Sequence, residues 1–116
     1  MKTSFWTTLE ALVQSSELVI DRPKGSTHPR YGSLVYPLDY GYLKGTSAAD
    51  GEGIDVWRGS LPGERLVAVV CTVDLLKRDA EIKLLLGCSQ AEQSLVCDFH
   101  NSGHSMAAIL LRREAG

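Results

Sequence analysis

The sequence lacks any long apolar run, and no window reaches the about eighteen residues that suggest a membrane-spanning helix. Its first residues show no apolar segment of signal-peptide character. It also lacks an excess of positive charge, because 12 lysines and arginines stand against 14 aspartates and glutamates. A protein dedicated to nucleic acids normally carries a basic stripe. We therefore expect a cytoplasmic protein that acts on neither membranes nor nucleic acids.

Cysteine is scarce, and its three copies are odd in number and widely spaced, at Cys71, Cys88 and Cys97. A disulfide framework in a small secreted domain usually needs an even set of closer cysteines. The pattern therefore predicts reduced thiols without a catalytic part. Cys97, His100 and His104 form a C-x₂-H-x₃-H pattern, which raises zinc as an alternative. We do not favour it, because no second cysteine is near enough in sequence to supply the usual fourth ligand.

What the chain does contain is ordinary for a globular protein. Its 116 residues are 44% hydrophobic and 22% charged, without a repeat or a low-complexity run. The length predicts one domain over residues 1–116, which would bury about two thirds of the surface of the unfolded chain.

Hydrophobic periodicity predicts a mainly β (α+β) fold with two helices. Apolar residues at helical spacing predict a helix over 4–15. A capping box at 89–92 begins a second helix, which ends near 101–103 and turns Leu95, Val96 and Phe99 inward. Strands are expected at 18–22, 56–59, 66–76, 81–87 and 106–111. The architecture implied is a small, mostly antiparallel barrel flanked by an N-terminal and a C-terminal helix.

The most distinctive stretch is a glycine-broken acidic loop that follows the tyrosine pair Tyr40 and Tyr42. Its carboxylates stand at positions 50, 52 and 55. On a regular strand the third would point away from the other two, but glycines at 51 and 53 let the backbone turn. Three convergent carboxylates favour a hard cation such as Mg²⁺, which takes oxygen ligands.

Alternatives to a metal site remain at this loop. Acidic, glycine-rich loops are usually solvated turns. A calcium EF-hand loop is excluded, because Ile54 and Asp55 stand where that loop needs an oxygen ligand and a glycine.

Two further segments have residues suited to a phosphate. The segment 24–30 combines cations, hydroxyl groups and a glycine, and Arg30 could contact two phosphate oxygens with its fork. On the predicted strand at 81–87, Asp79, Glu81 and Lys83 share one face. A surface loop and an exposed hairpin face would give the same two patterns.

Taken in order, these segments resemble the soluble (family I) inorganic pyrophosphatases. That family carries a Tyr-Pro-x-x-Tyr-Gly-Tyr segment and then Asp-x-Asp-Pro-x-Asp; this chain has Tyr36-Pro37-Leu38-Asp39-Tyr40-Gly41-Tyr42 and Asp50-Gly51-Glu52-Gly53-Ile54-Asp55. The flanking segments Val19-Ile20-Asp21-Arg22-Pro23, Arg30-Tyr31, 73–77 and 81–84 are also similar to family motifs. The resemblance covers about residues 18 to 88 and implies an OB-like barrel.

The chain departs from the family pattern at several places. Glu52 and Gly53 replace Asp-Pro, Arg30 replaces a lysine, and Gly32 replaces a glutamate. Only four residues separate the tyrosines at 31 and 36, so the hairpin with the family's substrate-binding arginine is missing. The family's C-terminal Tyr-Lys pair has no counterpart either, and the chain looks like a truncated relative.

The resemblance implies Mg²⁺-dependent hydrolysis of pyrophosphate to two phosphates by a metal-activated water. It assigns roles to eight residues: metal ligation to Asp50, Asp55 and Glu81, acceptance of the water's proton to Glu52, phosphate binding to Arg30, Tyr40 and Lys83, and a second-shell place to Asp21. Two alternatives stay open: a non-catalytic phosphate or nucleotide sensor, and a hydrolase of a larger phosphoanhydride. The resemblance also makes a homo-oligomer possible.

Overall fold

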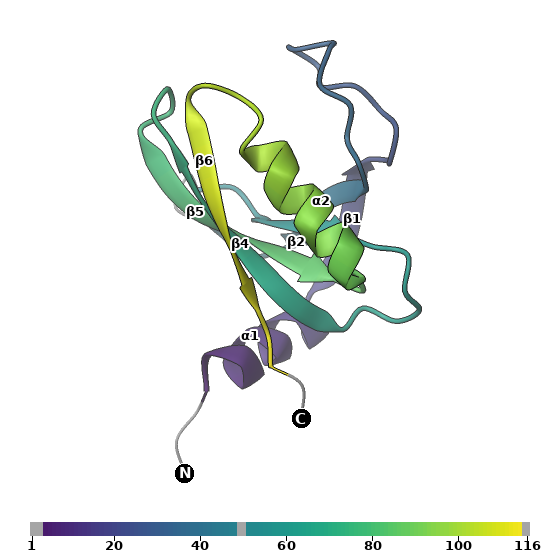
Figure 1. Cartoon of the computed structure of the whole chain (residues 1–116). Helices are drawn as coiled ribbons and strands as arrows, with labels where there is room; N and C mark the ends of the chain where they lie inside the picture. Colours follow the sequence, from purple (N-terminus) through teal and green to yellow (C-terminus); the bar gives the residue numbers. More distant parts are fainter. Residues whose placement is uncertain (1–3, 49–50, 115–116) are drawn as a thin grey trace.

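The computed structural model describes residues 4–48 and 51–114. Along the chain these residues form α1 (Phe5–Gln14), β1 (Glu17–Arg22), β2 (Asp39–Lys44), β3 (Ile54–Arg58), β4 (Leu66–Asp74), β5 (Asp79–Leu86), α2 (Gln90–His100) and β6 (Met106–Arg112) (Figure 1). Both predicted helices and the predicted strands are present. Neither helix in the described part is long and apolar enough to cross a membrane.

The described strands form one sheet in the order β1-β2-β3-β5-β4-β6. Every neighbouring pair is antiparallel except β3 and β5, which run parallel. In the part of the chain that the structure describes, β1 and β6 are the two edges, so the sheet is open. The mainly β, OB-like fold class predicted from the sequence is confirmed.

Each helix begins at a serine whose side chain satisfies a free backbone N–H of the first turn. Ser4 accepts from Thr7 at the start of α1. Ser89 and Glu92 form the predicted capping box of α2, in which each side chain accepts from the other's backbone N–H.

One detail of the second helix is wrong in the sequence prediction. Leu95 was expected to point inward, but it is 47% exposed, whereas the adjacent Val96 is completely buried. Neighbouring helix positions are about 100° apart around the axis, so both cannot face the same core. Phe99, three positions after Val96, packs against that core as expected.

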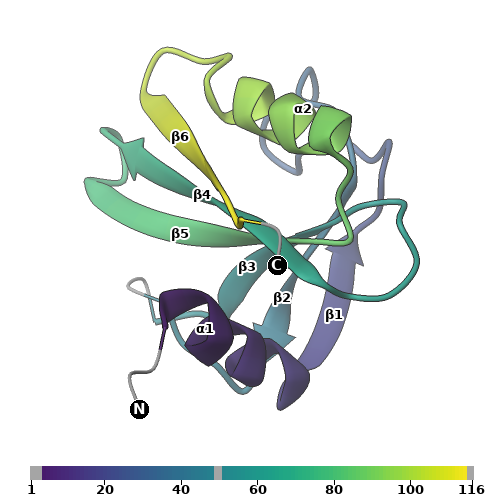
Figure 2. The same ribbon diagram turned by 60° about the horizontal axis from the view of Figure 1, so that its bottom comes forward.

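The sheet separates two hydrophobic cores. On one face, Leu9 and Val13 of α1 pack with Val56 and Leu84, among others. On the other face Val96 of α2 packs in a cluster with sheet residues that include Trp57 and Leu85. Figure 2 shows the two helices on opposite sides of the sheet. Because adjacent strand residues point to opposite faces, each central strand serves both cores.

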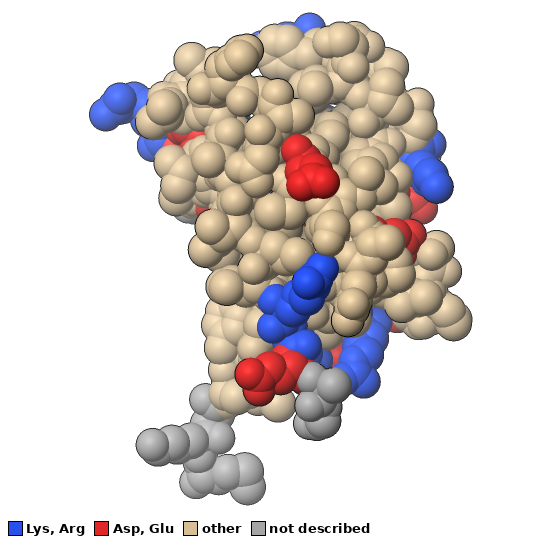
Figure 3. All heavy atoms as spheres, in the orientation of Figure 1, with Lys and Arg blue, Asp and Glu red and all other residues tan. Residues whose placement is uncertain are grey.

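Five exposed apolar side chains lie on β4, the β4–β5 turn and β6: Val73, Leu75, Leu76, Ile109 and Leu111. The face that carries α2 and β6 shows few charged groups, and most of them lie near its margins (Figure 3).

Candidate active site

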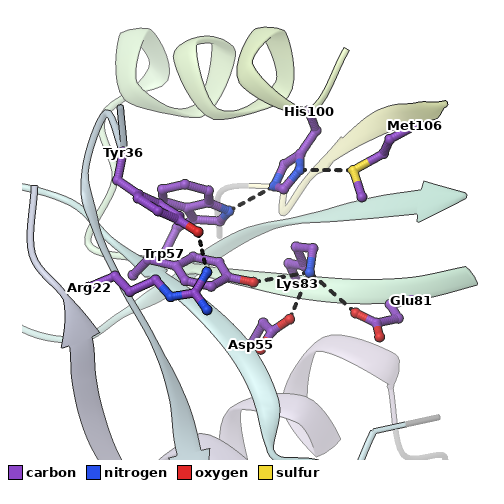
Figure 4. A network of polar contacts seen from close by, with 9 residues as sticks. Arg22, Tyr36, Asp55, Trp57, Glu81, Lys83, His100 and Met106 are labelled. Carbon is purple, nitrogen blue, oxygen red and sulfur yellow. Dashed lines mark hydrogen bonds and ion pairs between the residues drawn. The ribbon is translucent and has the colours of Figure 1, made fainter. Parts of the chain in front are cut away.

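Lys83 is the centre of a buried polar cluster on the face of the sheet that α2 partly covers. Its ammonium nitrogen Nζ donates to Asp55 Oδ2 at 2.7 Å, to Glu81 Oε2 at 3.2 Å and to the Tyr40 hydroxyl at 3.1 Å (Figure 4). The side chains of Lys83 and Glu81 are 7% exposed, and that of Asp55 is 27% exposed. Solvent therefore reaches the cluster mainly at Asp55.

The three strands β2, β3 and β5 place these groups by simple alternation. On β5, Lys83 lies between Ile82 and Leu84, which point to the α1 core. On β3, Asp55 has the same relation to Ile54 and Val56. The parallel pairing of Val56 with Leu84 then brings the two strands into the register that joins Asp55 and Lys83.

The electrostatics of the cluster keep its lysine charged and its tyrosine neutral. Burial lowers the pKa of Lys83, but the interactions with Tyr40 and Asp55 raise it more, and the net shift is upward. Burial, the largest cause, raises the pKa of Tyr40 well above its ordinary value. Lys83 is thus a fixed cation, and Tyr40 is a hydrogen-bonding group rather than a base.

An aromatic wall borders the cluster on the side of α2. The ring centroids of Tyr40 and Trp57 are 4.6 Å apart. Trp57 Nε1 donates to His100 Nε2 at 3.0 Å, and His100 Nδ1 lies 3.3 Å from the Met106 sulfur. Burial, with a smaller effect of the Lys83 charge, lowers the pKa of His100 to about 4.

These contacts bear on the zinc pattern at 97–104. Both ring nitrogens of His100 have partners within the protein, while His104 is exposed. The described residues contain no group of three or more His, Cys, Asp or Glu side chains placed to hold a metal ion. The three cysteines are free thiols, and burial raises the pKa of Cys88 to about 12.

No known protein family profile matches the sequence, and no curated protein matches it. Solved structures that are similar to it include the following two. An inorganic phosphatase from Anaplasma phagocytophilum superposes with a TM-score of 0.57 at 16% identity, over 82% of each chain. The inorganic pyrophosphatase from Helicobacter pylori gives 0.56 at 16% identity, over 83% of this chain and 80% of that one. The chain has a pyrophosphatase-like fold.

On this pyrophosphatase-like fold, four of the eight residues assigned from the sequence come together. They are Tyr40, Asp55, Glu81 and Lys83. They come from three separate strands, β2, β3 and β5, so their meeting is a property of the sheet.

The other four assigned residues are not part of this contact set. Asp50 lies outside the described residues. Glu52 is exposed in the loop before β3, where its carbonyl accepts from the Ala48 N–H at 2.6 Å. Arg30 is exposed in the loop before β2, and Asp21 is exposed on β1. Their assigned roles stay predictions.

The carboxylates of the cluster are of the kind that binds a hard cation, but two of them are too few for the predicted three-carboxylate site. Asp55 and Glu81 supply the oxygen ligands that Mg²⁺ prefers. Within residues 4–48 and 51–114 they are the only two assigned metal ligands, and both already accept from Lys83. Asp50, the third residue assigned as a metal ligand, lies outside the described residues.

Gly53 matters here because of a close approach. A Cβ at this position would lie 2.8 Å from Tyr42 Cδ2 and 3.0 Å from the Leu43 carbonyl oxygen. The loop therefore passes tightly against β2 as it enters β3. A proline, which the family motif has at this position, would meet the same obstruction.

The sequence interpretation missed Arg22, which precedes the proline that ends β1. Arg22 is the cross-strand partner of Tyr40, and its Nη1 donates to the Tyr36 hydroxyl. The available signal was a basic residue at the end of a strand beside a tyrosine-rich segment. That signal alone does not say which strand lies next to it.

Proposed function

We propose that this protein hydrolyses inorganic pyrophosphate to two phosphates with Mg²⁺ as its cofactor. The observation that carries the proposal is the buried contact of Lys83 with Asp55, Glu81 and Tyr40. The same four residues were assigned to metal and phosphate from the sequence motifs alone. The pyrophosphatase-like fold supports the assignment independently of those motifs.

Each part of the cluster has a role in this proposal. Asp55 and Glu81, with Asp50, hold Mg²⁺, which when bound neutralises phosphate oxygens and lowers the pKa of a bound water. Lys83 offers a fixed positive charge to a phosphate oxygen. Tyr40 keeps its proton and donates or accepts a hydrogen bond without competing for the proton of water.

Glu52 remains the proposed acceptor of the water's proton. It is exposed in the connection between β2 and β3, close in sequence to Asp55. To act as a general base, its carboxylate must come within hydrogen-bond distance of the attacking water. The longer glutamate side chain makes that reach depend on the path of the loop, which Gly53 holds against β2.

One observation favours a second candidate, a non-catalytic phosphate-binding protein. Both described carboxylates already bond to Lys83, and such a buried, satisfied cluster can be structural. A protein of this kind would bind phosphate through its cations without hydrolysis. The two candidates differ in turnover rather than in affinity.

Phosphate release with Mg²⁺ separates the candidates when pyrophosphate is compared with nucleoside triphosphates. We expect turnover of pyrophosphate, and a loss of about a hundredfold or more in Lys83→Met. Lys77→Met removes an exposed lysine of the β4–β5 turn and is the matched control. Binding of pyrophosphate without turnover would support the phosphate-binding candidate. Faster hydrolysis of nucleoside triphosphates would indicate a hydrolase of larger phosphoanhydrides.

The homo-oligomer also stays a proposal for this chain. The exposed apolar side chains of β4 and β6 give it a surface that self-association could cover. Sedimentation equilibrium over a range of protein concentrations tests it directly. A single species at the mass of one chain at every concentration would contradict it.

A further inference from the structure

A β-bulge in β1 decides which side chain stands beside Tyr40. Ile20 pairs with Gly41, and the next pair joins Arg22 to Tyr40, so Asp21 is an extra residue in the ladder. Without the bulge, Asp21 would be the partner of Tyr40. Because one inserted residue reverses the side-chain alternation that follows it, the bulge places a guanidinium there instead of a carboxylate.

The close approach of the two strands fixes this bulge in place. A Cβ at Gly41 would overlap the carbonyl oxygen of Val19 and lie 2.8 Å from the Cα of Ile20. Only glycine therefore permits this packing of β2 against β1. The position of Arg22 is thus built into the backbone.

Arg22 is held in a defined orientation. Its Nη1 donates to the hydroxyl of Tyr36, and its Cζ lies 5.4 Å from the centroid of the same ring. Tyr36 is only 4% exposed and packs among the aromatic residues of the α2 core. A buried ring therefore anchors the guanidinium, which limits the number of its conformations.

The guanidinium has no counter-ion in the described part of the chain. Ion pairs there join Lys83 to its two carboxylates and Arg113 to Glu10, and none includes Arg22. Burial lowers the pKa of Arg22, but the interaction with Tyr36 and, to a smaller extent, the charge of Asp21 raise it more, and the net shift is upward. A half-buried cation that keeps its charge and has spare donors is suited to an anion.

Two cations consequently flank Tyr40. Lys83 donates to its hydroxyl, and Arg22 lies opposite it across the β1–β2 ladder. In Figure 4 the Arg22 side chain extends from β1 toward the side on which Asp55 and Lys83 lie. His28 stacks on Tyr36, with ring centroids 6.2 Å apart. Burial and then the charges of Arg22 and Arg30 lower the pKa of His28.

We propose that Arg22 binds one phosphate group of the substrate while Lys83 binds the other. This inference takes the identity of the substrate, a compound with two linked phosphates, from the proposed function. Arg22 thereby supplies the bidentate cation that the sequence interpretation assigned to the exposed Arg30. The planar fork of arginine can donate to a phosphate oxygen with the nitrogens not used by Tyr36.

Binding of methylenediphosphonate, which cannot be hydrolysed, tests the inference apart from turnover. In isothermal titration calorimetry with Mg²⁺ present, we expect Arg22→Gln to weaken binding about tenfold or more. Arg78→Gln, in the β4–β5 turn, is the matched control and should change it by less than about threefold, because exposed charges contribute little. Equal affinity of Arg22→Gln and the parent protein overturns the inference, and so does a parent protein that does not bind.

Two conservative variants keep the test decisive if Arg22→Gln does not fold. Arg22→Lys retains the charge but loses the fork, and it should bind more weakly than the parent. Tyr36→Phe removes only the hydroxyl that orients Arg22, and it should weaken binding by a smaller factor. Unchanged affinity in both variants would mean that Arg22 serves only to pack against Tyr36. If the parent binds but does not hydrolyse pyrophosphate, the proposed activity fails while the role of Arg22 stands.

Discussion

The ammonium of Lys83 lies 2.7 Å from the carboxylate of Asp55, although the two residues are 28 positions apart in the chain. The same ammonium donates to Glu81, two positions away on its own strand. A single buried cation therefore pairs with two carboxylates from neighbouring strands. We therefore expect changes in this contact to alter both the free energy of unfolding and the binding of Mg²⁺.

Removal of the cation should destabilise the fold strongly. Lys83→Met keeps the length of the side chain but leaves two carboxylates in a mostly buried site, so we expect a loss of about 3–5 kcal/mol in the free energy of unfolding. Urea denaturation at pH 7 measures it, with Lys77→Met as the exposed control. Adding Asp55→Asn and Glu81→Gln to Lys83→Met should restore part of the loss. No recovery would mean that packing, rather than charge, explains the effect.

Magnesium should stabilise the folded protein through the acidic loop and Asp55. A ligand that binds only the folded state raises its stability, so millimolar Mg²⁺ should raise the melting temperature by about 3–5 °C. Asp55→Asn should abolish this rise, whatever its own melting temperature. Asp98→Asn, which changes an exposed carboxylate of α2, should keep it. A full Mg²⁺ response in the Asp55 variant would place the metal elsewhere.

His100 should make the protein sensitive to acid. Its pKa is about 4 in the folded protein, chiefly because it is buried, against about 6.5 in the unfolded chain. Between these values the unfolded chain binds more protons, so stability falls as the pH drops from about 6.5 to 4. The loss is about 3 kcal/mol in total.

The matched pair His100→Gln and His104→Gln measures that contribution. Glutamine at position 100 cannot titrate but can still accept from Trp57, so the unfolding free energy should depend less on pH in this range. His104 is exposed, and its variant should keep the dependence of the parent protein. Equal pH profiles for the parent and His100→Gln would contradict the assignment.

Glu52 should limit the rate of hydrolysis if it accepts the water's proton. Glu52→Gln should lose about a hundredfold to ten-thousandfold in kcat while still binding Mg²⁺ and phosphate. Glu52→Asp restores the side chain of the family motif at the same charge. It should equal or exceed the parent if the loop follows the family path, and fall short if the loop is adapted to glutamate. Full activity in Glu52→Gln would remove this residue from the mechanism.

Much of the local structure could be predicted from the sequence because the relevant forces are local. The capping box at Ser89 correctly predicted the start of α2, because its hydrogen bonds join residues only three positions apart. Alternating apolar residues marked the strands, and they correctly put Glu81 and Lys83 on one face. The prediction for Leu95 was wrong because this residue lies at the border between the buried and the exposed face of α2. Hydrophobicity alone does not say on which side of that border a side chain points.

Tertiary structure alone decided which predicted residues share a site. Periodicity says which face a side chain occupies, but the neighbour of a strand depends on long-range pairing that leaves no local trace. The parallel pairing of β3 with β5 brought Asp55 to Lys83. The bulge at Asp21, set by the contact between Gly41 and Val19, turned Arg22 toward Tyr40. One extra residue in a ladder reverses the side chains that follow it, and only the paired strand determines where that residue is inserted.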